Sequence, residues 1–155
     1  MEECDRAKRA AASLVSSRMY TCREVEERLR RKKIRRDVAE QVVSDFVAAG
    51  ILNDAEYARA YTQDAVRLGF KGVYRIQQEL YAKGVARSFA DRACEEFKGE
   101  TYDALCQYVD DRNLCEGIET YKDYEKLKAK LIRRGYSSSE IRKCLDRYDL
   151  KLKNE

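Results

Sequence analysis

The sequence predicts an all-α fold of three tandem three-helix repeats in an elongated, curved arrangement. The 155-residue chain has no proline and only seven glycines, fewer than the many turns of an all-β fold would require. Apolar residues recur at helical spacing, and the same pattern returns after a shift of 51 residues. We therefore expect three repeats, at residues 1–50, 51–99 and 100–155.

The stretch Gly69–Val85, GFKGVYRIQQELYAKGV, shows the repeated pattern most clearly. Its Val73, Ile76 and Leu80 lie on one helix face, and glycines interrupt the chain at both ends. Three-way alignment keeps an apolar residue at Val25/Ile76/Leu127, Leu29/Leu80/Leu131, Ile34/Val85/Tyr136, Ala39/Ala90/Ile141, Val43/Cys94/Leu145 and Phe46/Phe97/Tyr148. A repeat of about 50 residues is small for an independent core, so contacts between neighbours must contribute to stability.

Local signals predict three helices in the first repeat. Thr21-x-x-Glu24 is a capping-box pattern that opens the second of them, and Gly50 ends the third. The expected helices are Asp5–Ser17, Thr21–Lys32 and Val38–Val47.

The second and third repeats are predicted to follow the same plan, which makes nine helices in all. Gly99 closes the second repeat, Gly135 stops the middle helix of the third, and residues 151–155 are expected to fray. Ser137 or Ser138 is expected to cap the last helix, with Glu140 in its first turn. The remaining expected helices are Asp54–Leu68, Val73–Lys83, Ser88–Phe97, Glu100–Arg112, Asp123–Arg134 and Ser138–Tyr148, with a loop at Asn113–Thr120.

Composition argues against several classes of function. There is no histidine, so the usual general base near neutral pH and a common metal ligand are both absent. No two of the six cysteines are spaced as C-x-x-C, which favours reduced cysteines used as small apolar residues. We expect no enzyme, no cofactor and no metal. The charged N-terminus and the lack of a long apolar run lead us to expect a cytoplasmic monomer without membrane contact.

Two surfaces are candidates for binding a partner. Between positions 23 and 36 there are eight basic and three acidic residues, a local excess that attracts negative charge. The polar face of Val73–Lys83 carries two tyrosines, a residue type enriched at protein interfaces. The candidate residues are Arg30, Arg31 and Arg35 in the basic segment, and Tyr74, Arg75, Gln78, Tyr81 and Lys83 around the second surface.

The presence of each candidate residue can also be explained without a binding partner. The basic segment could be a solvated helix end, and Tyr74 and Tyr81 could pack against a neighbouring repeat. Lys83 is placed to cap its helix, because a cation in the last turn interacts favourably with the helix dipole. Tyr57 and Tyr61 are expected to belong to the core.

The run Gly50–Tyr61 (GILNDAEYARAY), continuing through Gly69–Gly72, Arg75–Leu80 and Lys83–Val85, resembles the RecX family of recombinase regulators. Leu14–Thr21 and Glu24–Leu29 in the first repeat resemble it as well. The likeness is strong over residues 5–97 and continues in the third repeat mainly through its register. This chain departs from the family at Val73, where a proline is common, and by an extra loop at Asn113–Thr120.

The resemblance implies an all-helical, non-enzymatic protein that binds RecA. Such proteins lie in the helical groove of the RecA filament on DNA, suppress strand exchange and ATP hydrolysis, and limit the SOS response. The implied partner is therefore the RecA filament, with DNA contacted weakly and in a salt-dependent manner. The alternative is a nucleic-acid-binding helical repeat without a RecA partner, for which binding to DNA alone should fall steeply with salt. An enzyme is a more distant alternative.

Overall fold

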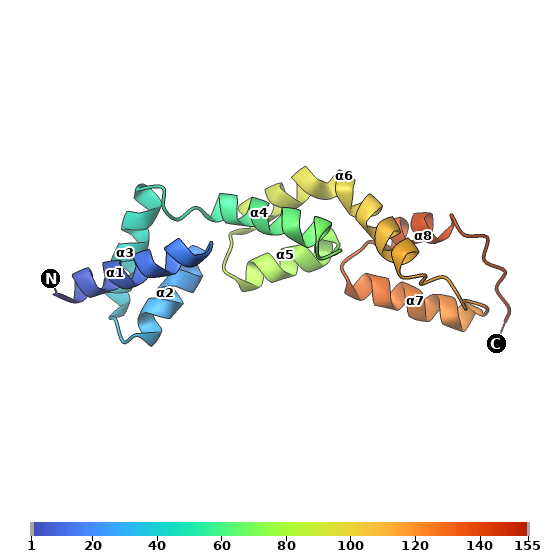
Figure 1. The fold of residues 1–155 in the computed structure, drawn as a ribbon, viewed down its shortest axis with the longest axis horizontal. Helices are drawn as coiled ribbons and strands as arrows, with labels where there is room; N and C mark the ends of the chain where they lie inside the picture. Colours follow the sequence, from blue (N-terminus) through green and yellow to red (C-terminus); the bar gives the residue numbers. More distant parts are fainter. Residues whose placement is uncertain (1, 155) are drawn as a thin grey trace. The chain divides into compact units, whose positions relative to one another are not determined.

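A computed structural model describes residues 2–154 of the chain. Over this range it contains eight α-helices and no strand, which confirms the all-α prediction (Figure 1). None of these helices combines the length and the apolar character needed to cross a membrane. The helices are α1 (Glu2–Ser17), α2 (Cys22–Arg31), α3 (Arg36–Ala48), α4 (Asp54–Arg67), α5 (Val73–Ala82), α6 (Arg87–Asp111), α7 (Tyr121–Arg133) and α8 (Ser138–Leu145).

Helix α6 corrects the predicted number of nine helices. The sequence predicts two helices separated at Gly99, whereas α6 runs through Gly99 without a break. A glycine ends a helix when it adopts a left-handed conformation, as Gly84 and Gly135 do with φ of 88° and 102°. Gly99 is not among the positive-φ residues of the described chain, so the helical backbone continues and the two predicted helices are one.

The described chain divides into two compact units. The N-terminal unit contains the residues up to Ala60 together with Leu80–Ala90, and the C-terminal unit contains Tyr61–Glu79 and the residues from Asp91 onward. The division crosses α4, α5 and α6, so each unit holds part of these three helices. The predicted repeat boundaries and the predicted curved shape stay predictions.

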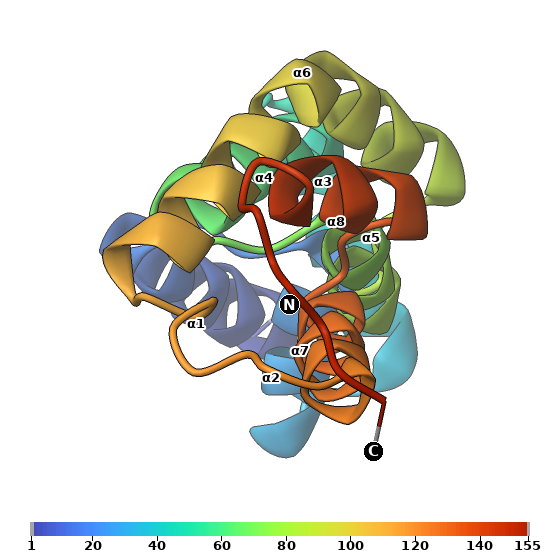
Figure 2. The ribbon, with the colours of Figure 1, turned by 90° about the vertical axis from the view of Figure 1, so that its right-hand side faces the viewer.

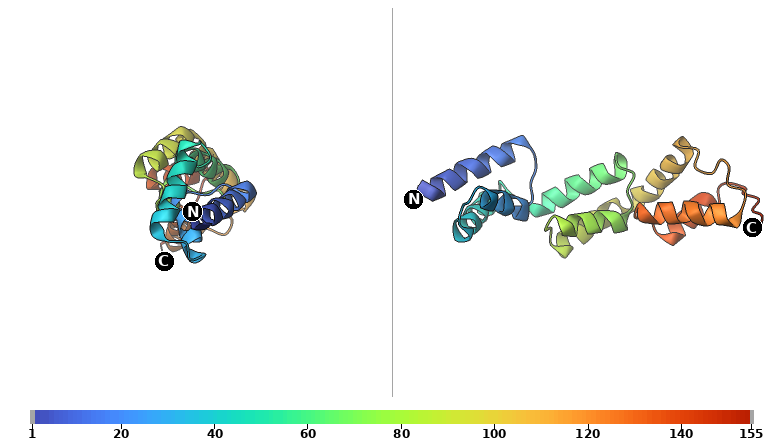
Figure 3. Two further views of the ribbon diagram at one scale, coloured as in Figure 1. Left: turned by 90° about the vertical axis from the view of Figure 1, so that its left-hand side faces the viewer. Right: turned by 90° about the horizontal axis from the view of Figure 1, so that it is seen from below.

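In the N-terminal unit, α1, α2 and α3 pack around one apolar cluster (Figure 3). The predicted capping box is present: the Glu24 amide donates to the Thr21 hydroxyl oxygen and the Thr21 amide donates to the Glu24 carboxylate. The cap satisfies amides that a helix start leaves without a partner, and so it sets where α2 begins. The buried residues of this cluster are Ala7, Ala11, Tyr20, Val25, Leu29, Ile34, Val38, Ala39, Val42, Phe46 and Leu52.

In the C-terminal unit, residues of α6, α7 and α8 form a second cluster (Figure 2). Capping boxes open α7, at Thr120 with Asp123, and α8, at Ser137 with Glu140. Of the two serines predicted as candidates, Ser137 is therefore the one that caps α8. The buried residues of the cluster are Leu105, Tyr108, Val109, Cys115, Leu127, Leu131, Tyr136, Ile141, Cys144 and Leu145.

The segment after α8 departs from the predicted fraying. The Lys153 amide donates to the Glu119 carbonyl at 2.8 Å, and the Lys153 carbonyl accepts from the Tyr121 amide at 3.1 Å. These two bonds hold the segment against the start of α7, the part of the molecule that Figure 2 turns toward the viewer. Backbone hydrogen bonds of this kind cannot be read from a polar, charged sequence.

Burial follows the 51-residue register of the sequence. Leu29, Leu80 and Leu131 are all completely buried, and most of the other aligned apolar positions are buried as well. Val43 and Tyr148 are only partly buried, which makes them the weakest members of the pattern. Among the expected inner positions of α4, Tyr57, Ala58 and Ala65 are buried, whereas Tyr61 is not fully enclosed.

Replacing Leu80 by alanine is expected to lower the free energy of unfolding by about 2–5 kcal/mol, because a fully buried leucine leaves a cavity. Thermal or denaturant unfolding measures this change. Leu68→Ala is the matched control: Leu68 is 76% exposed, and its loss should cost less than about 0.5 kcal/mol. Equal effects of the two substitutions would contradict the register.

Candidate functional site

The outward face of α5 is divided between exposed and partly covered side chains. Tyr74 is 60% exposed and Gln78 is also exposed, whereas Arg75 and Tyr81 are half-buried. Tyr74, Arg75 and Gln78 belong to the C-terminal unit and Tyr81 to the N-terminal unit. An exposed tyrosine presents a large, rigid apolar surface with a polar hydroxyl, which suits it to anchor a partner.

Tyr74 is positioned by a close backbone contact at the start of α5. The Gly72 amide donates to the Arg134 carbonyl at 2.8 Å, and the Tyr74 amide donates to the Gly135 carbonyl at 3.1 Å. A Cβ atom on Gly72 would lie 2.2 Å from the carbonyl carbon of Gly135, so no other residue fits without backbone movement. Two amides that a helix start leaves without an intrahelical partner are thereby satisfied by the turn after α7.

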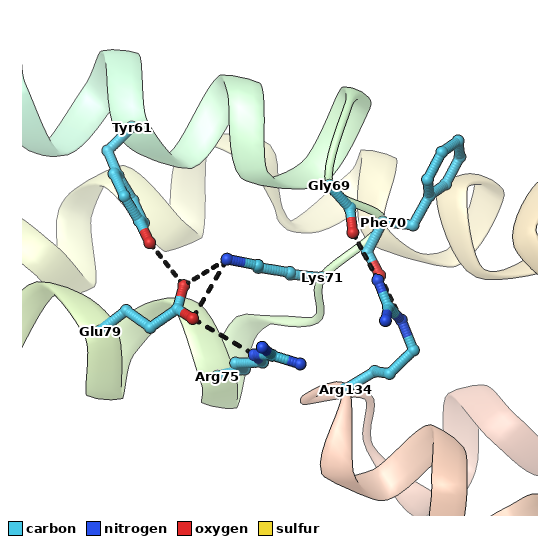
Figure 4. A network of polar contacts seen from close by, with 7 residues as sticks. All are labelled: Tyr61, Gly69, Phe70, Lys71, Arg75, Glu79 and Arg134. Atoms are coloured by element: carbon cyan, nitrogen blue, oxygen red, sulfur yellow. Dashed lines mark hydrogen bonds and ion pairs between the residues drawn. The ribbon is translucent and has the colours of Figure 1, made fainter.

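Behind this face, the Glu79 carboxylate accepts hydrogen bonds from three side chains (Figure 4). The Tyr61 hydroxyl donates at 2.5 Å, the Lys71 ammonium at 2.9 Å and the Arg75 Nε at 3.2 Å. Arg75, a candidate for partner binding, is therefore also part of an internal ion pair. The network explains why Tyr61 is only half-buried: its hydroxyl reaches the carboxylate instead of the apolar core.

The network holds Glu79 ionised. Burial raises the pKa of this carboxyl group, but the hydrogen bonds from Tyr61, Lys71 and Arg75 outweigh burial and leave the pKa below its ordinary value of 4.5. Because the pKa is lower in the folded state, the resulting stabilisation is fully present above the unfolded-state pKa. It is lost as the pH falls through the folded-state pKa.

Arg134 links the turn after α7 to the loop that precedes α5. Its Nη2 and Nε atoms donate to the carbonyls of Gly69 and Phe70, at 2.5 Å and 3.1 Å (Figure 4). Its guanidinium also lies 4.3 Å from the ring centre of Tyr108, and that of Arg112 lies 4.2 Å from the same ring. These contacts give Arg134 a structural role.

In the N-terminal unit, Lys83 occupies the position equivalent to Arg134. Its carbonyl accepts a 2.7 Å hydrogen bond from the Thr21 hydroxyl, and its ammonium lies 3.8 Å from the Glu24 carboxylate. The guanidinium of Arg87 lies 4.8 Å from the ring centre of Tyr81. Lys83 and Tyr81 thus have contacts within their own unit, which favours Tyr74 and Gln78 as the more accessible members of the candidate surface.

The basic segment lies at the end of α2 and the turn that follows. Arg30, Arg31 and Arg35 are all exposed. The Arg35 guanidinium lies 3.2 Å from the Glu3 carboxylate and 3.5 Å from that of Asp37, whereas no carboxylate among residues 2–154 pairs with Arg30 or Arg31. Arg30 and Arg31 therefore offer positive charge that is accessible to phosphate or to an acidic surface.

The sequence alone does not predict the Glu79 network. The pair of Arg75 and Glu79 could have been predicted, since residues four apart are neighbours on a helix. The contacts of Tyr61 and Lys71 with Glu79 could not, because they depend on how α4 and the following loop fold back on α5.

Cys22 and Cys94 are poorly suited to act as nucleophiles. Burial is the main cause that raises the pKa of Cys94 to about 11, and the same holds for Cys22. A thiol with such a pKa stays protonated near neutral pH and is a poor nucleophile. No cluster of potential metal ligands occurs in residues 2–154.

Comparison with known proteins shows to which family the chain is related. A family model described as the first three-helix domain of RecX matches residues 7–46, and another, described as the second, matches residues 53–93. Together they cover slightly more than half of the chain. The chain belongs to the RecX family. The first matched region corresponds to α1–α3, and the second begins just before α4 and ends within α6.

Relatives and solved structures extend the RecX match beyond these two regions. The regulatory protein RecX of Bacillus cytotoxicus is 30% identical over 147 residues, which cover 94% of this chain and 54% of that protein. The Bacillus thuringiensis protein of the same name is 31% identical with the same coverage. The chain thus spans about half the length of these relatives.

The fold is that of solved RecX structures. The crystal structure of RecX from Lactobacillus salivarius superposes with a TM-score of 0.81 at 22% identity, covering 96% of this chain and 97% of that one. A second RecX crystal structure gives the same score at 20% identity, with coverage of 93% and 72%. RecX is a family of regulatory proteins rather than enzymes, which agrees with the predicted lack of catalytic activity.

Replacing Glu79 by glutamine is expected to lower the stability of this RecX-family chain at pH 7 by about 1–3 kcal/mol, because the cations then lose their charged acceptor. The difference from the wild type should shrink as the pH falls through the folded-state pKa of Glu79, which lies below 4.5. Unfolding measured from pH 7 to pH 3 tests both parts. Glu40→Gln is the control, since Glu40 pairs with Arg36 at an exposed site. A pH-independent difference would show that the charge of Glu79 is not what stabilises the network.

Proposed function

We propose that this chain binds the RecA–DNA filament in its helical groove and inhibits strand exchange and ATP hydrolysis. It would thereby act as a negative modulator of recombination, DNA repair and the SOS response. Membership of the RecX family carries this proposal, and the exposed Tyr74 on α5 supports it. We further propose that the protein acts as a monomer and without a cofactor.

An inhibitor of this kind needs binding surfaces rather than catalytic groups. The chain offers two, the outward face of α5 around Tyr74 and the basic segment with Arg30 and Arg31. Because both lie on one chain, binding at one raises the effective concentration of the other at the filament. Two contacts that are weak by themselves can then hold the protein in place and compete with the motions that ATP turnover requires.

The second candidate function is binding to nucleic acid without a RecA partner. The exposed basic segment is the observation that favours it, because lysine and arginine side chains supply most of the affinity for a phosphate backbone. The two functions differ in a simple measurement: a nucleic-acid-binding protein should bind single-stranded DNA alone, and a filament inhibitor should bind tightly only after RecA has assembled on it.

Replacing Tyr74 and Tyr81 together by alanine is expected to raise the concentration needed to inhibit RecA ATP hydrolysis by at least about tenfold, or roughly 1.4 kcal/mol. Most of this effect should come from Tyr74, since Arg87 already covers part of Tyr81. The measurement is an ATPase titration on single-stranded DNA, with thermal unfolding of each variant. Tyr121→Ala is the matched control, because Tyr121 is similarly exposed on α7. A folded double variant that inhibits like the wild type would move the binding face away from α5.

Replacing Arg30, Arg31 and Arg35 by glutamine is expected to weaken filament binding and to flatten its dependence on salt concentration. Without these charges, fewer counterions are released on binding, and there is less electrostatic attraction for salt to screen. Binding measured between low and physiological salt gives the slope. A slope unchanged from the wild type would mean that this segment is only a solvated surface.

A further inference from the structure

The turns that follow α2, α5 and α7 occupy equivalent places in the 51-residue register of the sequence. The central residue of each turn is left-handed, with φ of 63° at Lys33, 88° at Gly84 and 102° at Gly135. Glycine adopts this conformation freely, whereas it is unfavourable for a residue that has a Cβ atom. The turn after α2 therefore carries a side chain at the position where the other two turns have none.

The two turns that contain glycine are packed against the start of another helix. The turn after α7 accepts backbone amides from the start of α5, and the turn after α5 accepts the Thr21 hydroxyl at the start of α2. A Cβ atom at Gly135 would lie 2.6 Å from the backbone nitrogen of Arg75. A Cβ atom at Gly84 would lie 2.7 Å from that of Arg23. Glycine at the centre of the turn is thus what lets a helix start approach so closely.

The turn after α2 is not packed against a helix start. No group among residues 2–154 donates a hydrogen bond to the carbonyl of Lys32 or of Lys33, and both residues are exposed. The Cβ atom of Lys33 occupies the space into which a helix start packs at Gly84 and Gly135. This turn therefore has the backbone of a docking turn together with a side chain that blocks docking.

The start of α7 offers backbone donors of the same kind, but the segment at residues 151–153, here called the strap, already occupies it. The Tyr121 amide, which has no acceptor within its own helix, donates to the Lys153 carbonyl at 3.1 Å. The Lys153 amide donates in turn to the Glu119 carbonyl at 2.8 Å. The Lys153 carbonyl thus supplies to α7 what the Gly135 carbonyl supplies to α5.

We propose that the start of α7 is a docking site for the turn after α2 of a second copy of the chain, and that the strap and Lys33 block this contact from its two sides. The occupant is a second copy because, within residues 2–154, this turn is the one of the three whose carbonyls accept no hydrogen bond from a helix start. The contact joins unlike surfaces, so that unblocked copies would assemble into open chains. The unfavourable conformation of Lys33 then has a purpose, namely to end the array of stacked helices.

Two substitutions together are expected to release the contact. Lys33→Gly removes the blocking Cβ atom, and Lys153→Pro removes the amide that holds the strap to Glu119. The double variant should show a sedimentation coefficient that rises with protein concentration, whereas the wild type and each single variant should sediment as monomers. Lys33→Gly alone should also raise the melting temperature, because glycine adopts the left-handed conformation without strain.

Matched variants separate docking from other causes of association. Lys33→Ala combined with Lys153→Pro loses the same charges but keeps a Cβ atom, so it should stay monomeric. Lys33→Gly combined with Lys151→Pro places proline at a strap residue whose amide donates to no acceptor within residues 2–154, and it should stay monomeric as well. Adding Tyr121→Pro to the double variant removes the donor amide at the first position of α7, where a helix accepts proline, and should abolish association.

Hydrogen exchange shows whether the strap has been released, because the Tyr121 amide should exchange faster in Lys153→Pro than in the wild type. Unchanged exchange would overturn the role of the strap, and a double variant that exchanges faster yet stays monomeric would overturn the docking site. Association that survives Tyr121→Pro would mean non-specific aggregation and would also overturn it.

The inference rests on the monomeric state in the proposed function, and the outcomes keep the two apart. If the wild type itself associates, the proposed monomeric state and the blocking of the docking site both fail. If the wild type is monomeric but does not inhibit RecA, only the proposed function fails. If the wild type inhibits RecA and the double variant stays monomeric, only the docking site fails.

Discussion

The start of α5 depends on the close approach of two glycines, and much of the C-terminal unit depends on that contact. Gly72 and Gly135 bring two backbone segments so close that a single Cβ atom would have no room. The hydrogen bonds made there satisfy amides at the start of α5, and Arg134 adds two further bonds to the same loop. Because Tyr74 follows two residues later, the same contact sets its position on the surface.

The N-terminal unit meets the equivalent constraint with different chemistry. Thr21 and Lys83 stand at the sequence positions of Gly72 and Arg134 in the 51-residue register, and the Thr21 hydroxyl takes the place of a backbone amide as donor to the turn. A Cβ atom on Gly84 would come within 2.7 Å of the Arg23 side chain. Close contact between a helix start and a glycine turn thus recurs in both units, through a side chain in one and through backbone alone in the other.

The face of α5 that we propose for recognition lies opposite the face that stabilises the fold. Ile76 and Leu80 are completely buried, and the equivalent residues of α2 and α7 are apolar and buried too. The outward positions are not repeated: Tyr74 corresponds to Arg23 and Glu125. The buried face therefore maintains a fold that is repeated along the chain, while the exposed face can differ from repeat to repeat. For this reason we propose α5, and not the repeat in general, as the recognition element.

The sequence by itself determined the helical class, the register of buried residues and several helix starts, because these follow from apolar spacing and from caps within a few residues. It placed Tyr74 and Tyr81 on the outward face of α5 without deciding whether they are covered, and of the two only Tyr74 is exposed. It failed at Gly99, because a glycine ends a helix only where the backbone turns left-handed, and the local sequence does not decide this. Only the tertiary structure decided the Glu79 network, since Tyr61 and Glu79 meet only after α4 and α5 have packed.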